Sequence, residues 1–450
     1  MAGSRGEFSS RFGFVMAASG SAVGLGNIWG FPTQAASNGG AAFLLVYLLL
    51  AFLLAYPALM AELILGRHAH SNSVAALRKV SGHRITGSIG ALTGITGLIV
   101  AGLILSFYAI VAGWMIAFCL SALATLSGNA ELANWLTSFG LWRNVLFLIV
   151  FLALTIGIVS AGVHDGIERW SRRLMPALLI TLVILVLYVF TLNGAMQGLK
   201  VYLMPDFSRV LSPQLILDAL GAAFFSLSLG VGTMLIYGSY VSDDENLPLL
   251  GGIVTLVDVS IAVLAGFLVL PAMYVALHNG VEIFNASGAL ISEDTLIFTV
   301  LPELFASMGL PGVLVSLVFF FLMSIAALTS SISMLEAPVA YVTEEHRIGR
   351  RLTAWLIGGV IACISCTILL NFDTLFGFII ALTTRYSQPL LGFMFCIYAG
   401  WVWRRDSLLQ ELRKGYPGVQ EGLFWKIWPW YVKVVCPLII LAIFAQSLLG

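Results

Sequence analysis

Two short stretches combine glycine and serine within otherwise apolar segments of the chain, and the first of them also contains asparagine. The first is GSAVGLGNIWGFP, residues 20–32, and the second is SLSLGVG, residues 226–232. Glycine and proline are poor helix formers, so both stretches weaken the backbone conformation that hydrocarbon favours. A broken helix exposes carbonyl groups at one half-helix end and amide groups at the other, which provides ligands for a cation and donors for an anion. The pattern predicts a binding site for small charged molecules.

The composition places these stretches in a membrane protein. The 450 residues are 60% hydrophobic and 10% charged, with a mean hydropathy of +0.99, which excludes an ordinary soluble globule. Apolar runs long enough to cross a bilayer start near residues 11, 40, 88, 145, 168, 214, 250, 309, 352, 374 and 424. The formal net charge of zero implies no nucleic acid or other polyanionic partner. We expect an all-α polytopic protein that is surrounded by a lipid bilayer.

The basic residues predict the orientation of the chain in this bilayer. Of 22 Lys and Arg residues, only Arg143, Lys200 and Arg209 fall in loops on one side, and Arg385 and Lys433 lie in or near spans. The other 17 lie in the N-terminal segment and in loops on the opposite side, which the positive-inside rule makes cytoplasmic. Eleven spans then place the C-terminus outside, in a protein of the cell (inner) membrane.

The two glycine-rich stretches lie five spans apart, in the first and sixth spans. Paired interruptions at matching positions indicate an inverted-repeat transporter with its site at the bilayer midplane. Because each half has an odd number of spans, the halves must be inverted. We expect a cytoplasmic segment over residues 1–10, five-span repeats over 11–190 and 214–403, an extracellular loop over 191–213, a cytoplasmic loop over 404–423 and an eleventh span over 424–450.

Several motifs resemble the neurotransmitter:sodium symporter family, in its bacterial amino-acid transporter branch. They are RFGFVMAASGSAVGLGNIWGFP, NGGAAFLLVYLLL, PALMAELILGR, the stretch from Tyr108 to Trp114, FFSLSLGVG and ALTSSIS. The resemblance covers the first ten spans. It implies a sodium-coupled symporter that works by alternating access of spans 1, 2, 6 and 7 against the rest, and that is not an enzyme.

The resemblance also implies two sodium sites and one substrate site. The first sodium site would use Ala22, Asn27, Ser226 and Asp258, and the second would use Gly20, Val23, Ala326, Thr329 and Ser330. The substrate site would use Ser21, Ala22, Leu25, Gly26, Ile104, Tyr108, Phe225, Ser226, Ser228, Val231, Ser330 and Met334. Oxygen ligands suit a hard cation. Hydroxyl groups in helices also bond to their own backbone, but two broken helices beside them favour sodium.

The expected substrate and ion dependence follow from a few of these positions. Monoamine carriers of the family have an aspartate where this chain has Ser21, so serine indicates an amino acid. Ile104 and Phe225 would line an apolar pocket, which favours a neutral hydrophobic amino acid, branched or aromatic. Asp258 would supply the negative charge that chloride supplies in animal relatives, since Ala262 replaces a serine of the chloride-dependent members. We expect two Na⁺ ions and no requirement for chloride.

The expected outer gate departs from the family pattern. Gly30 stands where many members carry an arginine, and the acidic partner is missing near Phe376, so we expect an apolar, aromatic outer seal. On the inner side, the resemblance implies a seal between Arg5 and Glu344 that is backed by Tyr237. The alternative for Arg5 is an ordinary topogenic charge.

Other residues leave alternatives open. Glu62 in the second span is expected to bond to amide groups of the broken sixth helix. Arg385 in the tenth span is either a functional residue or the partner of a buried acid such as Glu336. Gly166 and Pro176 mark either a segment that unwinds or a loop boundary at the start of the fifth span.

An intramembrane enzyme and an ion channel are the alternative functions. A serine protease would need an embedded histidine, and the six histidines sit in loops or at span ends: His68, His70, His83, His164, His278 and His346. Asp258 and Asp218 lack a motif for an aspartyl dyad. Two broken helices suit occlusion of a substrate better than a continuous pore. The oligomeric state is left open.

Overall fold

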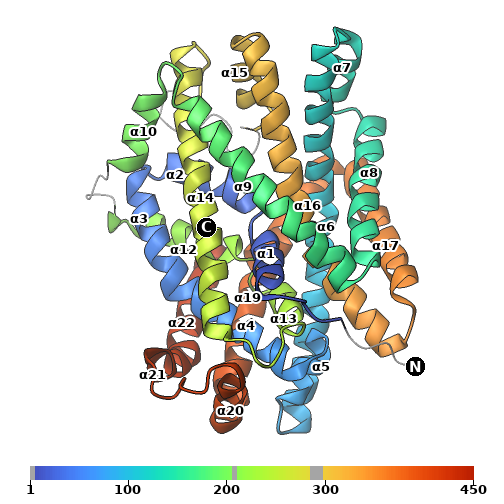
Figure 1. Ribbon diagram of the computed structural model, residues 1–450, viewed down its shortest axis with the longest axis vertical. Helices are drawn as coiled ribbons and strands as arrows, with labels where there is room; N and C mark the ends of the chain where they lie inside the picture. The colour runs from blue at the N-terminus through green and yellow to red at the C-terminus, as the bar shows by residue number, and fades with distance from the viewer. Residues whose placement is uncertain (1–5, 205–209, 284–296, 450) are drawn as a thin grey trace.

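The computed structural model describes residues 6–204, 210–283 and 297–449, and all regular structure in these ranges is helical. Eight helical stretches are long and apolar enough to cross a membrane, and one bent pair of helices adds a ninth. Most of them run along the long axis of the molecule (Figure 1).

The continuous stretches have the following bounds. They are α3 (Ala41–Leu50) with η2 (Ala51–Ala55) and α4 (Tyr56–Ala69), α6 (Arg84–Leu126), α8 (Leu141–Ser160), η3 (Val163–Glu168) with α9 (Arg169–Val189), α14 (Leu247–His278), α16 (Leu310–His346), α17 (Arg350–Leu370), and α21 (Leu423–Trp430) with η6 (Tyr431–Val435) and α22 (Cys436–Leu449). The tenth apolar run forms α18 (Phe372–Ile380), η4 (Ala381–Ser387), α19 (Gln388–Ile397) and η5 (Tyr398–Val402). The connecting helices are α5 (Ser73–Lys79), α7 (Ala130–Thr137), α10 (Ala195–Leu203), α15 (Val300–Ser307) and α20 (Arg405–Gly415).

Both predicted helix breaks are present. In the first, α1 (Arg11–Ala22) ends at an extended Val23, and the chain continues as η1 (Gly26–Gly30) and α2 (Phe31–Ser37) after a bend of 58°. In the second, α12 (Pro213–Ser226) and α13 (Thr233–Gly238) are separated by a segment with positive φ at Ser228, Gly230 and Gly232. Glycine adopts positive φ without steric cost, which explains two of these three positions.

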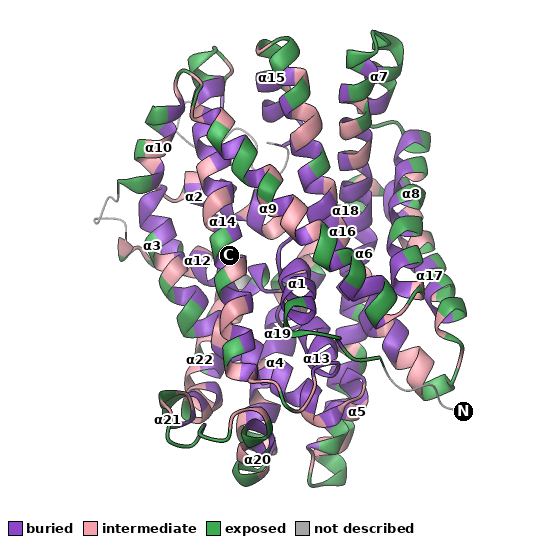
Figure 2. Ribbon diagram, viewed as in Figure 1, coloured by how far each residue is buried: buried purple, intermediate pink, exposed green. Residues whose placement is uncertain are grey.

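Burial follows the expectation for a protein in lipid. Figure 2 shows buried residues concentrated in the middle of the molecule around α1 and α13, whereas α7 and α20 at the two ends are largely exposed. Large apolar side chains are also exposed along the long helices, for example Ile99 at 57%, Ile184 at 55% and Val360 at 61%. Such side chains on a membrane-spanning helix contact hydrocarbon, which favours them there.

Small residues bring the second and sixth apolar stretches into backbone contact. A Cβ atom on Gly66 of α4 would lie 1.9 Å from the Leu235 carbonyl oxygen of α13, and one on Gly238 would lie 2.5 Å from the Leu63 carbonyl oxygen. Close approach at glycine is the usual way in which membrane helices pack tightly. The structure therefore holds α4 and α13 together as a pair.

A buried ion-pair network joins α20 to the end of α4. Arg67 Nε donates to Glu411 Oε1 at 2.8 Å, and its Nη1 donates to the Glu245 carbonyl oxygen at 2.7 Å. Lys414 Nζ lies 3.0 Å from Glu411 Oε2. Burial raises the pKa of Glu411, but hydrogen bonding to His68 and the charges of Arg67 and Lys414 outweigh this effect and lower the pKa from 4.5 to about 2.

Glu411→Gln is expected to lower the stability of the folded protein by about 3 kcal/mol at neutral pH. Because the folded-state pKa is depressed, the carboxylate stabilises the protein fully above its unfolded pKa, and this contribution is lost as pH falls toward about 2. Thermal unfolding in detergent is followed by tryptophan fluorescence. The difference in melting temperature between wild type and variant should become smaller below about pH 4.5. Exposed Glu421→Gln is the control and should leave the melting temperature unchanged. A difference in melting temperature that stays constant down to about pH 3 would contradict this account.

Candidate functional site

Buried oxygen atoms gather beside the break of the first helix. Asp258 of α14 accepts hydrogen bonds from Asn27 Nδ2 at 2.7 Å and from Ser226 Oγ at 2.7 Å. Asn27 Nδ2 also donates to Ser226 Oγ at 2.7 Å, and Tyr47 OH donates to the same oxygen at 3.2 Å. The side chains come from four separate spans, and Asp258 is 1% exposed. The structure thus brings Asn27, Ser226 and Asp258 of the predicted first sodium site together.

The carboxylate of Asp258 has only neutral partners. No ion pair involving Asp258 occurs within residues 6–204, 210–283 and 297–449, and its side-chain hydrogen bonds come from an amide and a hydroxyl group. Burying an unpaired charge costs roughly several kcal/mol, so the Asp258 carboxylate requires a counter-ion or a proton. A hard cation fits the carboxylate and the Ser226 hydroxyl oxygen, whereas Asn27 turns its Nδ2 toward them.

A second group of oxygen atoms lies where α1 ends against α16. Ser330 Oγ donates to the Val23 carbonyl oxygen at 2.9 Å and to the Gly20 carbonyl oxygen at 3.3 Å. Thr329 Oγ1 donates to the Ala326 carbonyl oxygen at 3.0 Å, within its own helix. The Thr329 hydroxyl therefore bonds as in an ordinary helix, whereas the Ser330 hydroxyl bonds to carbonyl groups of the broken first helix. All five predicted residues of this second site are adjacent, and none is charged.

A cavity lies between the two broken helices and is lined by eleven of the twelve predicted substrate-site residues. They are Ala22, Leu25, Gly26, Ile104, Tyr108, Phe225, Ser226, Ser228, Val231, Ser330 and Met334. Gly24, Thr233 and Gln388 complete the lining and were not predicted. The lining combines hydroxyl groups and unwound backbone with aliphatic and aromatic side chains.

The unwound backbone approaches the cavity walls closely at Gly24. The Leu25 N–H points to the Tyr108 hydroxyl oxygen at 3.4 Å, which leaves the hydroxyl hydrogen available to another acceptor. A Cβ atom on Gly24 would lie 2.7 Å from Ser330 Oγ and 2.9 Å from the Tyr108 oxygen. One on Gly26 would lie 3.0 Å from the Phe225 ring. Glycine at position 24 is therefore a requirement of the packing, not only of the helix break.

Comparison with known proteins shows the family of the chain. Residues 5–138 and 127–450 match the profile of the sodium:neurotransmitter symporter family. The chain belongs to this family. A sodium-dependent transporter of Bacillus subtilis (strain 168) is 34% identical over 453 residues, which cover 97% of this chain and 96% of the relative. The sodium-dependent serotonin transporter of Drosophila melanogaster is 26% identical over 499 residues, 97% of this chain and 75% of the relative.

A solved structure resembles this symporter over almost its whole length. The crystal structure of MhsT in complex with L-phenylalanine matches with a TM-score of 0.83 and 33% identity, over 98% of this chain and 100% of that chain. The predicted fold class is confirmed: an all-α membrane protein with a 5+5 inverted repeat, broken helices 1 and 6 and an eleventh span. The family also confirms that the protein is a transporter and not an enzyme.

Ser21 is the predicted substrate-site residue that does not line the cavity of the symporter. Its hydroxyl donates to Ser333 Oγ at 2.6 Å, and both side chains are buried. Its carbonyl oxygen accepts a hydrogen bond from Ser228 Oγ at 3.0 Å. Ser21 therefore ties the first broken helix to α16 and to the second broken helix behind the cavity wall.

Gln388 is the most informative lining residue that sequence reasoning missed. It begins α19, is 2% exposed, and its Nε2 donates to the Leu229 carbonyl oxygen in the unwound segment at 2.8 Å. Its Oε1 has no hydrogen-bond partner within the described part of the chain. The signal in the sequence was a carboxamide just before Pro389 within an apolar run.

The structure shows the partners of two buried acids, Glu62 and Glu336. Glu62 Oε1 accepts a hydrogen bond from the Gly230 N–H at 2.7 Å, which confirms the predicted contact with the broken sixth helix. Glu336 forms an ion pair with Arg350 and accepts a hydrogen bond from Tyr240 OH at 2.5 Å. The alternative that paired Glu336 with Arg385 is therefore wrong, and Arg385 is exposed on η4.

The fifth span begins in π-helical form. Residues Val163–Glu168 form η3 and continue directly into α9, which stays helical through Pro176. A Cβ atom on Gly166 would lie 2.0 Å from the Ile158 carbonyl oxygen, so the glycine allows close packing against α8. The loop boundary lies before Val163, and the described segment is helical from there on.

A cluster of aromatic rings lies next to α7 and α15, around Phe298. Phe298 contacts Trp29, Trp114, Phe118 and Phe320, with ring centroids 5.4–6.3 Å apart. Phe376, where an acid was expected to be missing, stacks on Trp114 at 6.3 Å. A Cβ atom on Gly30 would have nothing closer than a backbone oxygen at 4.0 Å.

The opposite side of the symporter carries Tyr237 and Glu344 of the predicted inner gate. Arg5 lies outside the described residues. Glu344 Oε2 accepts hydrogen bonds from the backbone N–H and the Nδ2 of Asn72, both at 2.9 Å. Tyr237 is buried, and its ring packs edge-on against Phe8 with centroids 5.7 Å apart. The N-terminal segment therefore reaches Tyr237 through Phe8.

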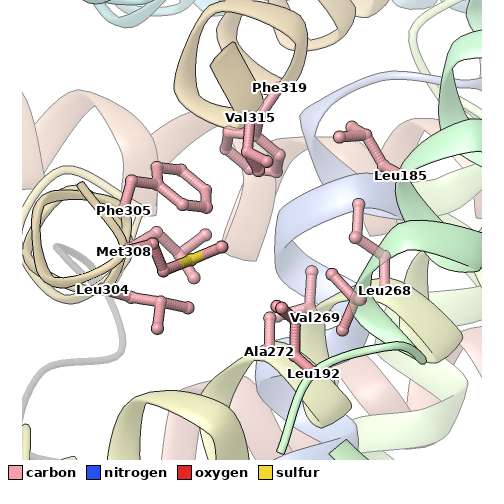
Figure 3. A pocket seen from close by; sticks show the side chains of 12 residues that line it. Leu185, Leu192, Leu268, Val269, Ala272, Leu304, Phe305, Met308, Val315 and Phe319 are labelled. Atoms are coloured by element: carbon pink, nitrogen blue, oxygen red, sulfur yellow. The ribbon is translucent and has the colours of Figure 1, made fainter. Parts of the chain in front are cut away.

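A separate cavity between α9, α14, α15 and α16 is wholly apolar (Figure 3). Leucine, valine and phenylalanine side chains line it, such as Leu185, Val269 and Phe319. It offers no polar atom to an ammonium or carboxylate group, so it does not suit an amino acid.

Proposed function

We propose that this sodium-dependent symporter carries a neutral hydrophobic amino acid, branched or aromatic, together with two sodium ions and without chloride. The observation that carries the proposal is Asp258, a buried carboxylate with neutral partners beside a helix break. A sodium ion balances this charge and is held by the Ala22 carbonyl oxygen with Asn27, Ser226 and Asp258. Because Asp258 supplies the negative charge itself, chloride is not needed.

The second ion and the substrate occupy the neighbouring groups in this proposal. The oxygen atoms of Gly20, Val23, Ala326, Thr329 and Ser330 hold the second sodium. The Tyr108 hydroxyl and the backbone near Leu25 and Gly26 hold the substrate carboxylate. Ile104, Phe225, Val231 and Met334 hold an apolar side chain. The L-phenylalanine in the MhsT structure supports a substrate of this class.

Uptake into proteoliposomes tests the proposal. We expect radiolabelled phenylalanine or leucine to accumulate under a sodium gradient and not under a potassium gradient, and the other neutral hydrophobic amino acids to compete. Replacing chloride with gluconate should leave uptake unchanged. Equal uptake in sodium and potassium would refute sodium coupling, and loss of uptake in gluconate would refute the role given to Asp258.

We also propose that spans 1, 2, 6 and 7 move as a bundle against the rest, within five-span repeats over residues 11–190 and 214–403. The backbone contacts between α4 and α13 support a shared movement of spans 2 and 6. The distribution of basic residues supports an inner membrane location with a cytoplasmic N-terminus and an external C-terminus. A C-terminal tag should therefore react with an impermeant label in intact cells, and protection of the tag would reverse the topology.

Ser330→Ala is expected to raise the sodium concentration for half-maximal uptake by about tenfold, because it removes a ligand of the second ion. The matched control is Ser324→Ala in the same helix, whose hydroxyl bonds to the Phe320 carbonyl oxygen at 2.8 Å. Sodium titrations of uptake compare the two variants. An unchanged sodium dependence in Ser330→Ala would place the second ion elsewhere.

The gates lead to a further prediction. We propose an aromatic outer seal around Phe298 and an inner seal of Arg5 with Glu344, backed by Tyr237. Arg5→Ala should then favour inward-open forms, so that a cysteine introduced near Tyr237 reacts faster with a thiol reagent, by about fivefold or more. Arg84→Ala, in an exposed position, is the control. Equal labelling in both backgrounds would speak against this inner seal.

A further inference from the structure

A cavity apart from the transport site lies between η5, α20 and the junction of α21 with η6. Three cationic side chains line it from three elements: Arg405 of α20, Lys426 of α21 and Lys433 of η6. Trp403 and Trp430 form part of its wall. Both α20 and α21 lie at the end of the molecule that also carries α5 (Figure 1).

The three cations have no acidic partner. Within the described ranges, no carboxylate lies within ion-pair distance of Arg405, Lys426 or Lys433. The neighbouring cations Arg67 and Lys414, in contrast, are both paired with Glu411. Three uncompensated charges around one cavity produce a positive potential that attracts an anion.

The surroundings hold two of these cations in place. The Lys433 ammonium lies 4.3 Å from the centroid of the Trp401 ring, and Trp401 Nε1 donates to the Lys433 carbonyl oxygen at 2.7 Å. The Arg405 guanidinium lies 5.4 Å from the centroid of Trp425. Such cation–π contacts fix a charged group without neutralising it.

The outside of the cavity is apolar and tryptophan-rich. Trp430 is 61% exposed and Leu423 is 74% exposed on α21. On its other side, α21 borders an apolar groove shared with Phe52 and Tyr56 of the second span. Exposed tryptophans typically lie at the boundary between hydrocarbon and water. An anion that carries apolar chains therefore fits this position better than a free ion.

We propose that Arg405, Lys426 and Lys433 form a binding site for the headgroup of an anionic phospholipid, whose acyl chains lie along the exposed apolar face of α21. The phosphodiester contacts the three cations, and the tryptophans flank the glycerol region. The site is independent of the transported amino acid. Because α20 also holds Arg67 through Glu411, the lipid adjoins the link between α20 and the second span.

Native mass spectrometry of the full-length protein in detergent tests the site, with phosphatidylglycerol and phosphatidylcholine of identical acyl chains. We expect wild type to bind phosphatidylglycerol at least about tenfold more tightly, because each lysine or arginine near a phosphate contributes about a fivefold gain. The triple variant Arg405→Gln, Lys426→Gln, Lys433→Gln should lose this preference. The single variant Lys426→Gln should lower it about fivefold, which provides a test if the triple variant does not fold.

The control removes three exposed cations from the same end of the molecule, by Arg78→Gln, Arg84→Gln and Arg351→Gln. It should keep the preference of wild type. Equal binding of the two lipids to wild type would overturn the site, and an equal loss in the control would assign binding to general surface charge. Displacement of phosphatidylglycerol by millimolar inorganic phosphate would identify a free-anion site instead.

Discussion

Asp258→Asn is expected to raise the sodium concentration for half-maximal uptake by about 100-fold, because breaking a buried charge pair costs about 3 kcal/mol. The amide keeps the shape and some hydrogen-bonding capacity of the carboxylate, so the change removes mainly its negative charge. The two neutral partners, Asn27 and Ser226, cannot replace that charge. Uptake measured against sodium concentration, with salt balanced by choline, gives the result.

The control for this variant is Asp373→Asn, which alters an exposed aspartate in α18. Its sodium dependence should match wild type. If Asp258→Asn also kept the sodium dependence of wild type, the first ion would not be bound by this carboxylate. Chloride provides a second comparison. The variant lacks the charge that we propose takes the place of the anion, so it should transport better in chloride than in gluconate.

Gly24→Ala is expected to abolish substrate uptake, with a loss of about 100-fold or more. The added methyl group would lie 2.7 Å from Ser330 Oγ and 2.9 Å from the Tyr108 oxygen, so both groups would have to move. These two side chains border the cavity and belong to the proposed second sodium site and carboxylate site. Such a displacement lowers uptake by more than the loss of packing alone would, because it disturbs the alignment of several groups that bind ligands.

Gly30→Ala, six residues further along the same broken helix, is the matched control. Its methyl group would have no atom within less than 4.0 Å, so uptake should stay near that of wild type. Binding of a radiolabelled amino acid to purified protein separates loss of the site from loss of folding, and the melting temperature provides a second check. Similar uptake by both variants would show that the space around Gly24 is not used by ligands.

Local composition predicted much of this structure. Glycine-rich stretches within apolar runs located both helix breaks, because glycine weakens a helix wherever it occurs. Contacts between distant segments could not be predicted in the same way. The bond from Ser21 to Ser333 joins residues 312 positions apart, and nothing near Ser21 in the sequence indicates it.

Gln388 in the tenth span and the partner of Glu336 were not predicted, and both omissions have physical causes. The π-helical segment Ala381–Ser387 precedes Gln388, and such a segment changes which side chains face the interior after it, so a 3.6-residue pattern does not predict that Gln388 lines the cavity. Arg350 reaches Glu336 because the chain reverses between α16 and α17, where Arg347 has a φ of 54°. Arg350 is the first residue of α17, so it lies in a basic segment between two spans and not within an apolar run.

In the proposed cycle, the second oxygen group, which is built from uncharged residues, would make transport depend on the membrane voltage. An amino acid is a zwitterion and Asp258 offsets one sodium ion, so the second ion leaves the loaded site of the proposed cycle with a net positive charge. Moving one elementary charge across a membrane is worth about 2.3 kcal/mol per 100 mV. A negative interior would therefore draw the loaded carrier inward, and accumulation of the amino acid would continue after the sodium concentrations on the two sides had become equal.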